Sequence, residues 1–291
     1  MTADADLSSP TAGPDAILRV GVGGWTFVPW RNNFYPSGWV QRRELEYASR
    51  KLTAIEINGT FYGAQKPAVY AKWAQDTPDG FVFSLKAPGR IVDSRSLRGT
   101  GGAIEAFVSG GLAELGDRLG PLLWQLGPNR IFDADEIAAF LDLLPRDLDG
   151  RRLRHVLEVR NDSFLCPAFL DLMRRHGHAT VFTDSPKYPS FADVCSDFVY
   201  ARLMRSQAHI DTGYTDADLD TWAARARRWS QGGAPTDLPL VMPASPAPVQ
   251  ARDVFVYFIS SAKERNPAAA MALRSRLDVD RPAPVGGATT A

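Results

Sequence analysis

Eight short apolar segments, separated by segments with helical spacing, constrain the fold of this chain more than any other feature. The segments are rich in β-branched and aromatic residues, which are typical of strands. The predicted strands cover residues 17–24, 53–58, 81–86, 120–126, 154–160, 179–184, 197–203 and 253–260. The predicted helices cover residues 42–51, 67–75, 102–118, 134–144, 167–176, 216–231 and 267–277. This alternation indicates β/α units and a parallel sheet.

Eight strands with crossover helices close most simply into a (β/α)8 barrel of the TIM type, which usually takes ~250 residues. The predicted barrel domain covers residues 17–279 of the 291, and a doubly wound open sheet is the alternative. The Pro/Ala-rich segment 232–250 is predicted to be an insertion before the last strand. Residues 1–16 and 280–291 are predicted to be disordered tails, because they are rich in Pro, Ala, Ser, Gly and Thr.

The composition excludes several classes of partner. Lys plus Arg and Asp plus Glu number 33 each, so no global field favours nucleic acid or an anionic membrane. No uncharged apolar run approaches the ~18 residues of a membrane span, and the first residues lack the pattern of a secretory signal. We therefore expect a cytoplasmic protein. The sequence identifies no cofactor, since "GVGGWT" lacks the third glycine of a dinucleotide-binding motif.

Polar side chains occupy one face of several predicted strands. In "TAIEINGTFYG", Glu56 and Asn58 alternate with Ile55 and Ile57, so the two pairs point to opposite faces. The same alternation places Ser84 with Lys86, Glu158 with Arg160 and Tyr200 with Arg202, while Gln125, Asp184 and Ser260 end their own strands. If the apolar residues contact the helices, the polar residues point inward and meet at the C-terminal mouth, where barrels of this type carry their active sites. The alternative is a structural network that only satisfies itself.

These motifs resemble those of the DUF72 family of (β/α)8-barrel proteins. The resemblance covers roughly residues 18–277 and rests on "GGWTFVPWRNNFYP", "LTAIEINGTFYG", "TPDGFVFSLKAP", "LGPLLWQLGP", "LEVRNDSF", "DFVYARL" and "VFVYFIS" in this order. It implies a TIM-like fold and a polar mouth, but no reaction. The family's characteristic positions correspond to Trp25, Glu56, Asn58, Tyr62, Lys86, Gln125, Glu158, Arg160, Asp184, Tyr200 and Arg202.

The chain departs from the family pattern at three places. Members often carry a histidine after the third strand, an Arg-x-His-Gly sequence after the seventh and paired asparagines after the eighth. Here the corresponding residues are "APGRIVDSRSL", Arg202 to Arg205, and Ser260 with Ser261. A mechanism that uses those histidines is therefore not expected.

The inward charges suggest a ligand class. Glu56, Glu158 and Asp184 could hold a hard cation, but Lys86, Arg160 and Arg202 bring at least as much positive charge. This balance favours a small anionic or polyhydroxylated ligand over a metal ion. Aromatic side chains such as Trp25, in the loop after the first strand, could add a wall suited to a flat ligand or a sugar ring.

Three chemical roles are open at this stage. Glu56 and Glu158 resemble the paired carboxylates of glycoside hydrolases, with Asp184 as a further catalytic candidate. Lys86 could form a Schiff base, although a neighbouring carboxylate is expected to keep it charged and unreactive. The remaining predicted residues, Trp25, Asn58, Tyr62, Lys86, Gln125, Arg160, Tyr200 and Arg202, are assigned to substrate binding.

The leading hypothesis is an enzyme, possibly a hydrolase, that uses carboxylate acid/base chemistry. The alternative is a barrel that binds a ligand or a partner protein without catalysis. Arg202 is the sharpest case within these hypotheses. It could grip an oxyanion of the substrate, or it could be the buried ion partner of Glu158 or Asp184.

Overall fold

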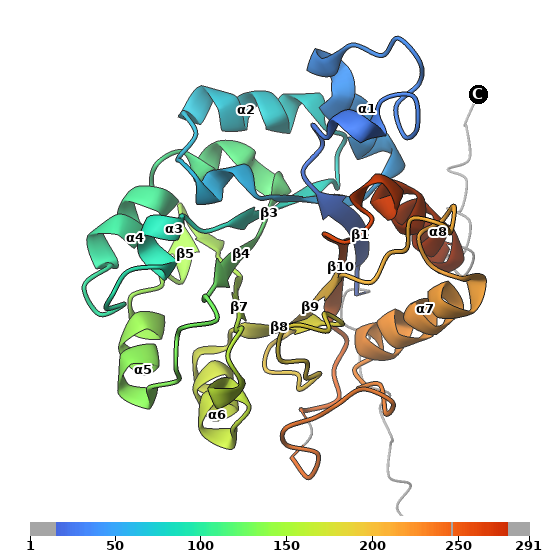
Figure 1. Ribbon diagram of the computed structural model, residues 1–291. Coiled ribbons are helices and arrows are strands. Elements are labelled where there is room, and N and C mark those ends of the chain that lie inside the picture. The colour runs from blue at the N-terminus through green and yellow to red at the C-terminus, as the bar shows by residue number, and fades with distance from the viewer. Residues whose placement is uncertain (1–15, 246, 279–291) are drawn as a thin grey trace, which may run out of the picture.

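The computed structural model describes residues 16–245 and 247–278, which form an eight-stranded parallel barrel surrounded by helices (Figure 1). Apart from Ala16, the two predicted tails lie outside these residues. All eight predicted strands are confirmed within two residues at each end. They are β1 (Leu18–Gly23), β2 (Ala54–Ile57), β3 (Val82–Lys86), β4 (Leu119–Gln125), β7 (His155–Glu158), β8 (Ala179–Thr183), β9 (Phe198–Leu203) and β10 (Asp253–Phe258).

The barrel is closed by the pairing of its first and last strands. β1 pairs in parallel with β2 on one side and with β10 on the other, from Leu18 opposite Val254 to Val22 opposite Phe258. The strand order around the ring is β1-β10-β9-β8-β7-β4-β3-β2. This closure confirms the (β/α)8 barrel and excludes the open-sheet alternative.

The helices follow the predicted positions with one correction. They are α1 (Glu44–Lys51), α2 (Pro67–Asp76), α3 (Gly89–Val92), α4 (Gly101–Val108), α5 (Ala134–Asp142), α6 (Pro167–His176), α7 (Asp216–Ser230) and α8 (Asn266–Asp278). The prediction of a single helix over 102–118 is wrong, because α4 ends at Val108 and a 3₁₀ helix, Leu112–Arg118, follows. Gly111 and Gly116 have φ angles of 121° and 53°, which interrupt a right-handed helix.

Capping residues explain why several helices start where they do. Thr215 and Asp218 form a capping box at the start of α7. The Asp133 side chain accepts a hydrogen bond from the Glu136 amide at the start of α5. α2 and α6 have proline in their first turn, where the missing N–H costs nothing. These local signals fix the helix starts independently of the barrel.

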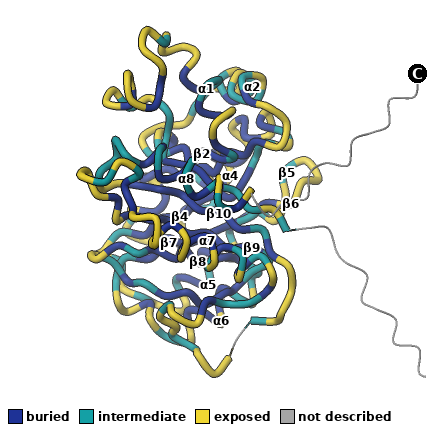
Figure 2. The backbone as a smooth tube through the Cα atoms, turned by 90° about the vertical axis from the view of Figure 1, so that its right-hand side faces the viewer, coloured by how far each residue is buried: buried dark blue, intermediate teal, exposed yellow. Residues whose placement is uncertain are grey.

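The buried side chains form two layers. Figure 2 shows the buried stretches of the chain gathered in the middle of the molecule, with exposed stretches at its periphery. The larger layer lies between the strands and the helices, and the smaller one fills the barrel interior. Gly21 shows how tightly the interior is packed, because a Cβ there would lie 2.1 Å from the carbonyl oxygen of Ala54 and 3.1 Å from the Tyr257 ring. Gly21 therefore makes room inside the barrel.

Two further segments complete the described chain. A short antiparallel hairpin, which the sequence pattern did not predict, pairs β5 (Asp147–Leu148) with β6 (Arg151–Arg152). In the predicted insertion, residues 232–245 and 247–250 contain neither helix nor strand. Among the helices of residues 16–245 and 247–278, none combines the length and apolar character needed to cross a bilayer.

Candidate functional site

The strand register brings the predicted inward residues to one level of the barrel. Gly23 lies opposite Glu56, and Glu56 lies opposite Ser84. On the other side of the ring Gln125 pairs with Glu158, and Tyr257 with Arg202. Because inward side chains alternate along each strand, the C-terminal ends of β2, β3, β4, β7 and β9 project polar groups into the same space.

Glu56 and Arg202 form a bidentate ion pair at the centre of this space. Arg202 Nη2 lies 2.9 Å from Glu56 Oε1, and Arg202 Nε lies 3.0 Å from Glu56 Oε2. The carboxylate also accepts hydrogen bonds from Asn58 Nδ2 at 3.0 Å and from the Tyr200 hydroxyl at 2.8 Å. Each Glu56 oxygen thus has two donors, and its side chain is fully buried.

Glu158 is the second carboxylate bound to Arg202. Its Oε2 accepts hydrogen bonds from Arg202 Nη1 and, at 2.9 Å, from Gln125 Nε2. Its Oε1 accepts one from Arg160 Nε at 2.8 Å. Arg202 therefore joins two buried carboxylates. The structure thus supports the hypothesis that Arg202 is a buried ion partner of Glu158.

The electrostatics of the network keep Glu158 and Arg202 ionised. Burial by itself raises the pKa of the Glu158 carboxyl, but Arg202 and Arg160 reverse this effect and hold its pKa below the ordinary value. Burial likewise lowers the pKa of the Arg202 guanidinium, and Glu158 and Glu56 raise it above its ordinary value. A carboxylate in this state is a poor proton donor at neutral pH.

Lys86 differs from the other charged residues of the mouth. Within the described chain its ammonium group makes no hydrogen bond or salt bridge. Its Nζ lies over the Phe61 ring, 4.0 Å from the ring centroid. Burial and the positive charge of Arg202 lower its pKa to about 8, although Glu56 and Glu158 oppose this shift. An amine with this pKa is still mostly protonated at pH 7, as expected for Lys86, but desolvation brings its pKa close to neutral pH despite the attraction of the carboxylates.

Arg160 links the buried network to an open cavity. Its Nη1 lies 3.3 Å from the Tyr188 hydroxyl, and its guanidinium carbon lies 4.1 Å from the centroid of the Tyr188 ring. The cavity has a volume of about 740 Å³ and is lined by Arg160, Ser185, Pro186, Lys187, Tyr188, Met204, Arg205, Ser206, Gln207, Ser260 and Ser261. Pockets that bind small molecules have volumes of this order.

Asp184 does not join the network, contrary to the prediction that it points inward. Thr183 occupies the inward position opposite Arg202, so the next side chain along β8 points away from the barrel interior. The Asp184 carboxylate accepts a hydrogen bond from the Met204 amide at 2.5 Å. Burial raises its pKa to about 6, while the hydrogen bond from Met204 opposes the shift. Its catalytic assignment has no support from this position.

Two predicted binding residues lie outside the network. Trp25 packs edge-on against Trp73, with ring centroids 5.1 Å apart, and against Phe83 in the helix-facing layer. Tyr62 is 88% exposed on the loop after β2. Asn58, Gln125 and Tyr200 are in the network, but their hydrogen bonds orient the two glutamates. Their assignment to substrate binding remains a prediction.

The described residues contain no group of three or more His, Cys, Asp or Glu side chains placed to hold a metal ion. His155 faces outward, where its Nδ1 accepts a hydrogen bond from Trp124 Nε1 at 3.0 Å and its Nε2 lies 2.7 Å from the Pro145 carbonyl oxygen. Burial lowers its pKa to about 4, so the ring is neutral at pH 7.

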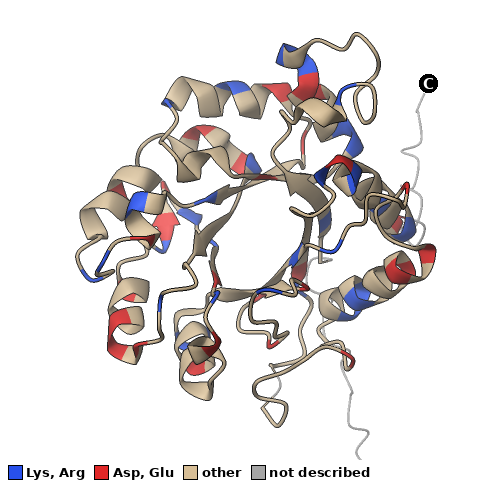
Figure 3. Cartoon of the chain, in the orientation of Figure 1, with Lys and Arg blue, Asp and Glu red and all other residues tan. Residues whose placement is uncertain are grey.

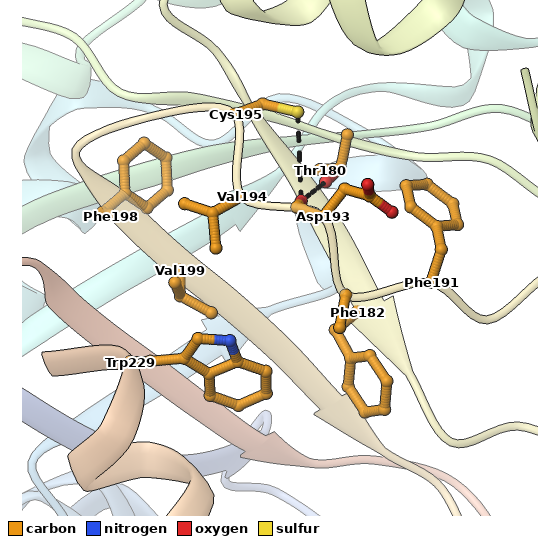
Figure 4. A pocket seen from close by; sticks show the side chains of 10 residues that line it. Thr180, Phe182, Phe191, Asp193, Val194, Cys195, Phe198, Val199 and Trp229 are labelled. Carbon is orange, nitrogen blue, oxygen red and sulfur yellow. Dashed lines mark hydrogen bonds between the residues drawn. The ribbon is translucent and has the colours of Figure 1, made fainter. Parts of the chain in front are cut away.

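Cys195 lies away from the mouth, beside a cavity of about 10 Å³ between β8, β9 and α7 (Figure 4). Its thiol is 3.9 Å from the Asp193 carbonyl oxygen. Burial raises its pKa to about 12, so the thiol carries no nucleophilic charge at neutral pH. This cavity is too small for an organic ligand.

Sequence reasoning missed several residues of the mouth. The Tyr257 hydroxyl lies 2.7 Å from Ser84 Oγ in the barrel interior, and the alternation of "VFVYFIS" could have identified Tyr257 as inward. Tyr188 and Ser206 lie in loops, where no periodic pattern indicates direction. Figure 3 shows positive and negative residues interspersed over the outer helices. The charges of these outer helices therefore do not indicate where the site lies.

A closed parallel barrel with charged groups at the carboxyl ends of its strands places this chain among the TIM-barrel proteins. The chain belongs to the DUF72 family, described as proteins of unknown function, whose family model matches residues 19–289. UPF0759 protein YecE of Escherichia coli K12 is 29% identical over 143 residues, which are 48% of this chain and 49% of YecE. The match thus spans about half the length of this curated relative.

Solved structures share the fold along almost the whole chain. A DUF72 family protein from Thermotoga maritima MSB8 superimposes with a TM-score of 0.69 at 17% identity, covering 90% of this chain and 99% of that protein. One from Enterococcus faecalis V583 has a TM-score of 0.67 at 15% identity, covering 91% and 97%. At these identities the similarity is evidence for the fold alone.

Proposed function

We propose that this protein is an enzyme that acts by acid/base chemistry on a small anionic or carbohydrate-like substrate at the C-terminal mouth of the barrel. The observation that carries the proposal is Lys86, a half-buried amine without an ion partner among the described residues, beside carboxylates that are already paired. The charges of Glu56, Glu158, Lys86, Arg160 and Arg202 sum to +1 when all are ionised. Such a mouth attracts a negative group.

The carboxylate-based version of the hypothesis needs revision. Glycoside hydrolysis by a pair of carboxyl groups requires one of them to be protonated at the start of the reaction. Glu158 accepts from Gln125, Arg160 and Arg202, and its pKa lies below the ordinary value. We therefore assign Glu56 and Glu158 to positioning Arg202 and Arg160, and the proton transfer to Lys86, whose pKa is about 8.

Competitive labelling tests this assignment without knowledge of the substrate. The folded protein is acetylated with trace reagent across pH 6 to 11, and mass spectrometry follows Lys86 and the exposed Lys66 as an internal control. We expect Lys86 to gain reactivity around pH 8, well below the pH at which an ordinary lysine does so, and at lower pH than the Lys66 control. Equal profiles for the two lysines would remove the basis for proton transfer by Lys86.

A panel of sugar acids, carboxylates and phosphate esters then tests for a substrate. We expect a member of the panel to protect Lys86 from labelling and to be turned over, and Lys86→Met to abolish turnover.

The second candidate function is a barrel that binds its ligand without catalysis. It is favoured by the complete hydrogen bonding of Glu56, which resembles a structural ion network. Tight binding without turnover would support this alternative.

A further inference from the structure

The loops after β8, β9 and β10 form a cavity of unusual composition beside the buried ion network. Of the residues that line it, Arg160, Lys187 and Arg205 are cationic, and none is acidic. Ser185, Ser206, Ser260 and Ser261 add hydroxyl groups. A cavity of this kind favours an anion with several acceptor oxygens over a neutral or cationic ligand.

Ser206 is the second observation that points to a ligand. Ser206 is one of the residues that line the cavity and is 6% exposed, and its almost inaccessible hydroxyl oxygen has no hydrogen-bond partner among the described residues. A buried hydroxyl without a partner destabilises the folded protein, so such a group calls for an explanation, and a bound ligand is one. Its backbone carbonyl oxygen accepts a hydrogen bond from the Ala262 amide at 3.4 Å, which connects the two loops.

Two of the three cationic groups at the cavity form no salt bridge among the described residues. Among the described residues, neither Lys187 nor Arg205 forms a salt bridge, and Arg205 Nε donates to the backbone carbonyl oxygen of Asp184 at 2.6 Å. Arg160 is already paired with Glu158. Arg205 also acts electrostatically on the Asp184 carboxyl. Two positive charges without a salt bridge match a phosphate ester, which carries about −1.5 to −2 at pH 7, better than a single carboxylate.

The backbone around the cavity fits the same ligand. Ser260 and Ser261 have φ angles of 59° and 49°, so two successive residues without the freedom of glycine adopt the left-handed conformation. A 3₁₀ helix, Lys263–Arg265, comes after these two residues and directly before α8. Phosphate groups in TIM barrels are frequently bound by the loops after the seventh and eighth strands and a short extra helix.

We propose that this cavity binds the phosphate group of a phosphorylated small-molecule substrate, with Arg205, Lys187 and the Ser206 hydroxyl as its ligands. The inference rests on the proposed function, because it assigns a second part of the same substrate. Lys86 would act on the portion of the molecule inside the barrel mouth, and Arg160, which touches both regions, would lie between the two portions.

The test uses the full chain and inorganic phosphate, followed by calorimetry, with acetate at matched ionic strength for comparison. We expect phosphate to bind and acetate to bind at least ~10-fold more weakly. Arg205→Met should weaken phosphate binding ~10-fold or more, and Lys187→Met should weaken it by a smaller factor. The matched control Arg175→Met, at an exposed arginine on α6, should leave it unchanged.

Ser206→Ala separates a ligand role from a structural one. Because its hydroxyl has no partner in the protein, the variant should melt at or above the wild-type temperature, while phosphate affinity falls about 3- to 10-fold. Absence of phosphate binding, or equal affinity in wild type, Arg205→Met and Ser206→Ala, would overturn the inference. If Lys86 still shows ligand-protected reactivity in that case, the proposed function stands and only the phosphate assignment fails.

Discussion

The two halves of the barrel interior are built by the same strands and differ completely in chemistry. The half toward the N-terminal ends of the strands is filled by Ala54, Val82, Leu123, Val156, Ala179, Val181, Phe198 and Phe255. The half toward the C-terminal ends holds Glu56, Lys86, Gln125, Glu158 and Arg202. The step from one to the other takes only two residues along a strand, from Ala54 to Glu56 or from Val156 to Glu158.

The comparison shows how the fold supports a costly site. Burying an ion costs several kcal/mol before pairing, so the charged half contributes little net stability. The apolar half stabilises closure through the hydrophobic effect, at about 25 cal/mol per Å² of apolar surface removed from water. Stability and chemistry are therefore assigned to different ends of the same strands.

The largest expected effect is the removal of the central charge of the mouth. Arg202→Met leaves Glu56 and Glu158 buried without their common partner, so we expect it to lower the free energy of unfolding by about 3 to 5 kcal/mol. Chemical denaturation measures the loss. The triple variant Glu56→Gln, Glu158→Gln, Arg202→Met should recover most of it, because no charge is then stranded.

A control in the apolar half completes this comparison. Phe255→Leu keeps an apolar side chain of similar volume and should cost about 1 kcal/mol without changing ligand binding. Should Arg202→Met prove as mild as Phe255→Leu, the ion network would not be the tightly coupled unit that the distances indicate.

Lys86→Met should instead stabilise the protein while it abolishes function. A pKa lowered to about 8 means that the folded state disfavours the charged amine. The penalty is fully present below pH 8 and disappears as pH rises toward the unfolded value of about 10.4. We expect the variant to gain about 1 to 3 kcal/mol at pH 7 and almost nothing at pH 10.5, measured by denaturation at both pH values. A loss of stability at pH 7 would show that the ammonium group is well solvated or paired.

Asp184→Asn is expected to have the smallest effect. The carboxyl pKa of about 6 means that ionisation destabilises the folded state between the unfolded value of about 3.9 and pH 6, and fully above it. Asparagine keeps an acceptor for the Met204 amide but carries no charge, so we expect a gain of about 1 kcal/mol at pH 7 and none near pH 4. Thermal melts at the two pH values measure this difference. A large loss of turnover with unchanged stability would restore the catalytic assignment of Asp184.

The sequence by itself determined the barrel and most of the inward set. Eight predicted strands alternate with seven predicted helices, a pattern that favours a (β/α)8 barrel, and the pairing of β1 with β10 then excluded the open sheet. Strict alternation then identified Glu56, Lys86, Glu158 and Arg202 as sharing one interior, because the side-chain period of a strand is two residues. Asp184 was predicted to point inward because it ends its strand, whereas alternation from the inward Thr183 places it on the other face.

Only the tertiary structure decided which charge pairs with which. Arg202 could have faced a substrate, but residues 56 and 158, far apart in the chain, meet it from opposite sides and use its donors. Lys86 has no such partner in the described residues. The reason is that the carboxylates of β2 and β7 bind Arg202 of β9 instead. The cavity with Ser206 depends on how two irregular loops pack together. The direction of side chains has a period of two residues in a strand and no period in a loop. This difference separates what could be predicted from the sequence from what could not.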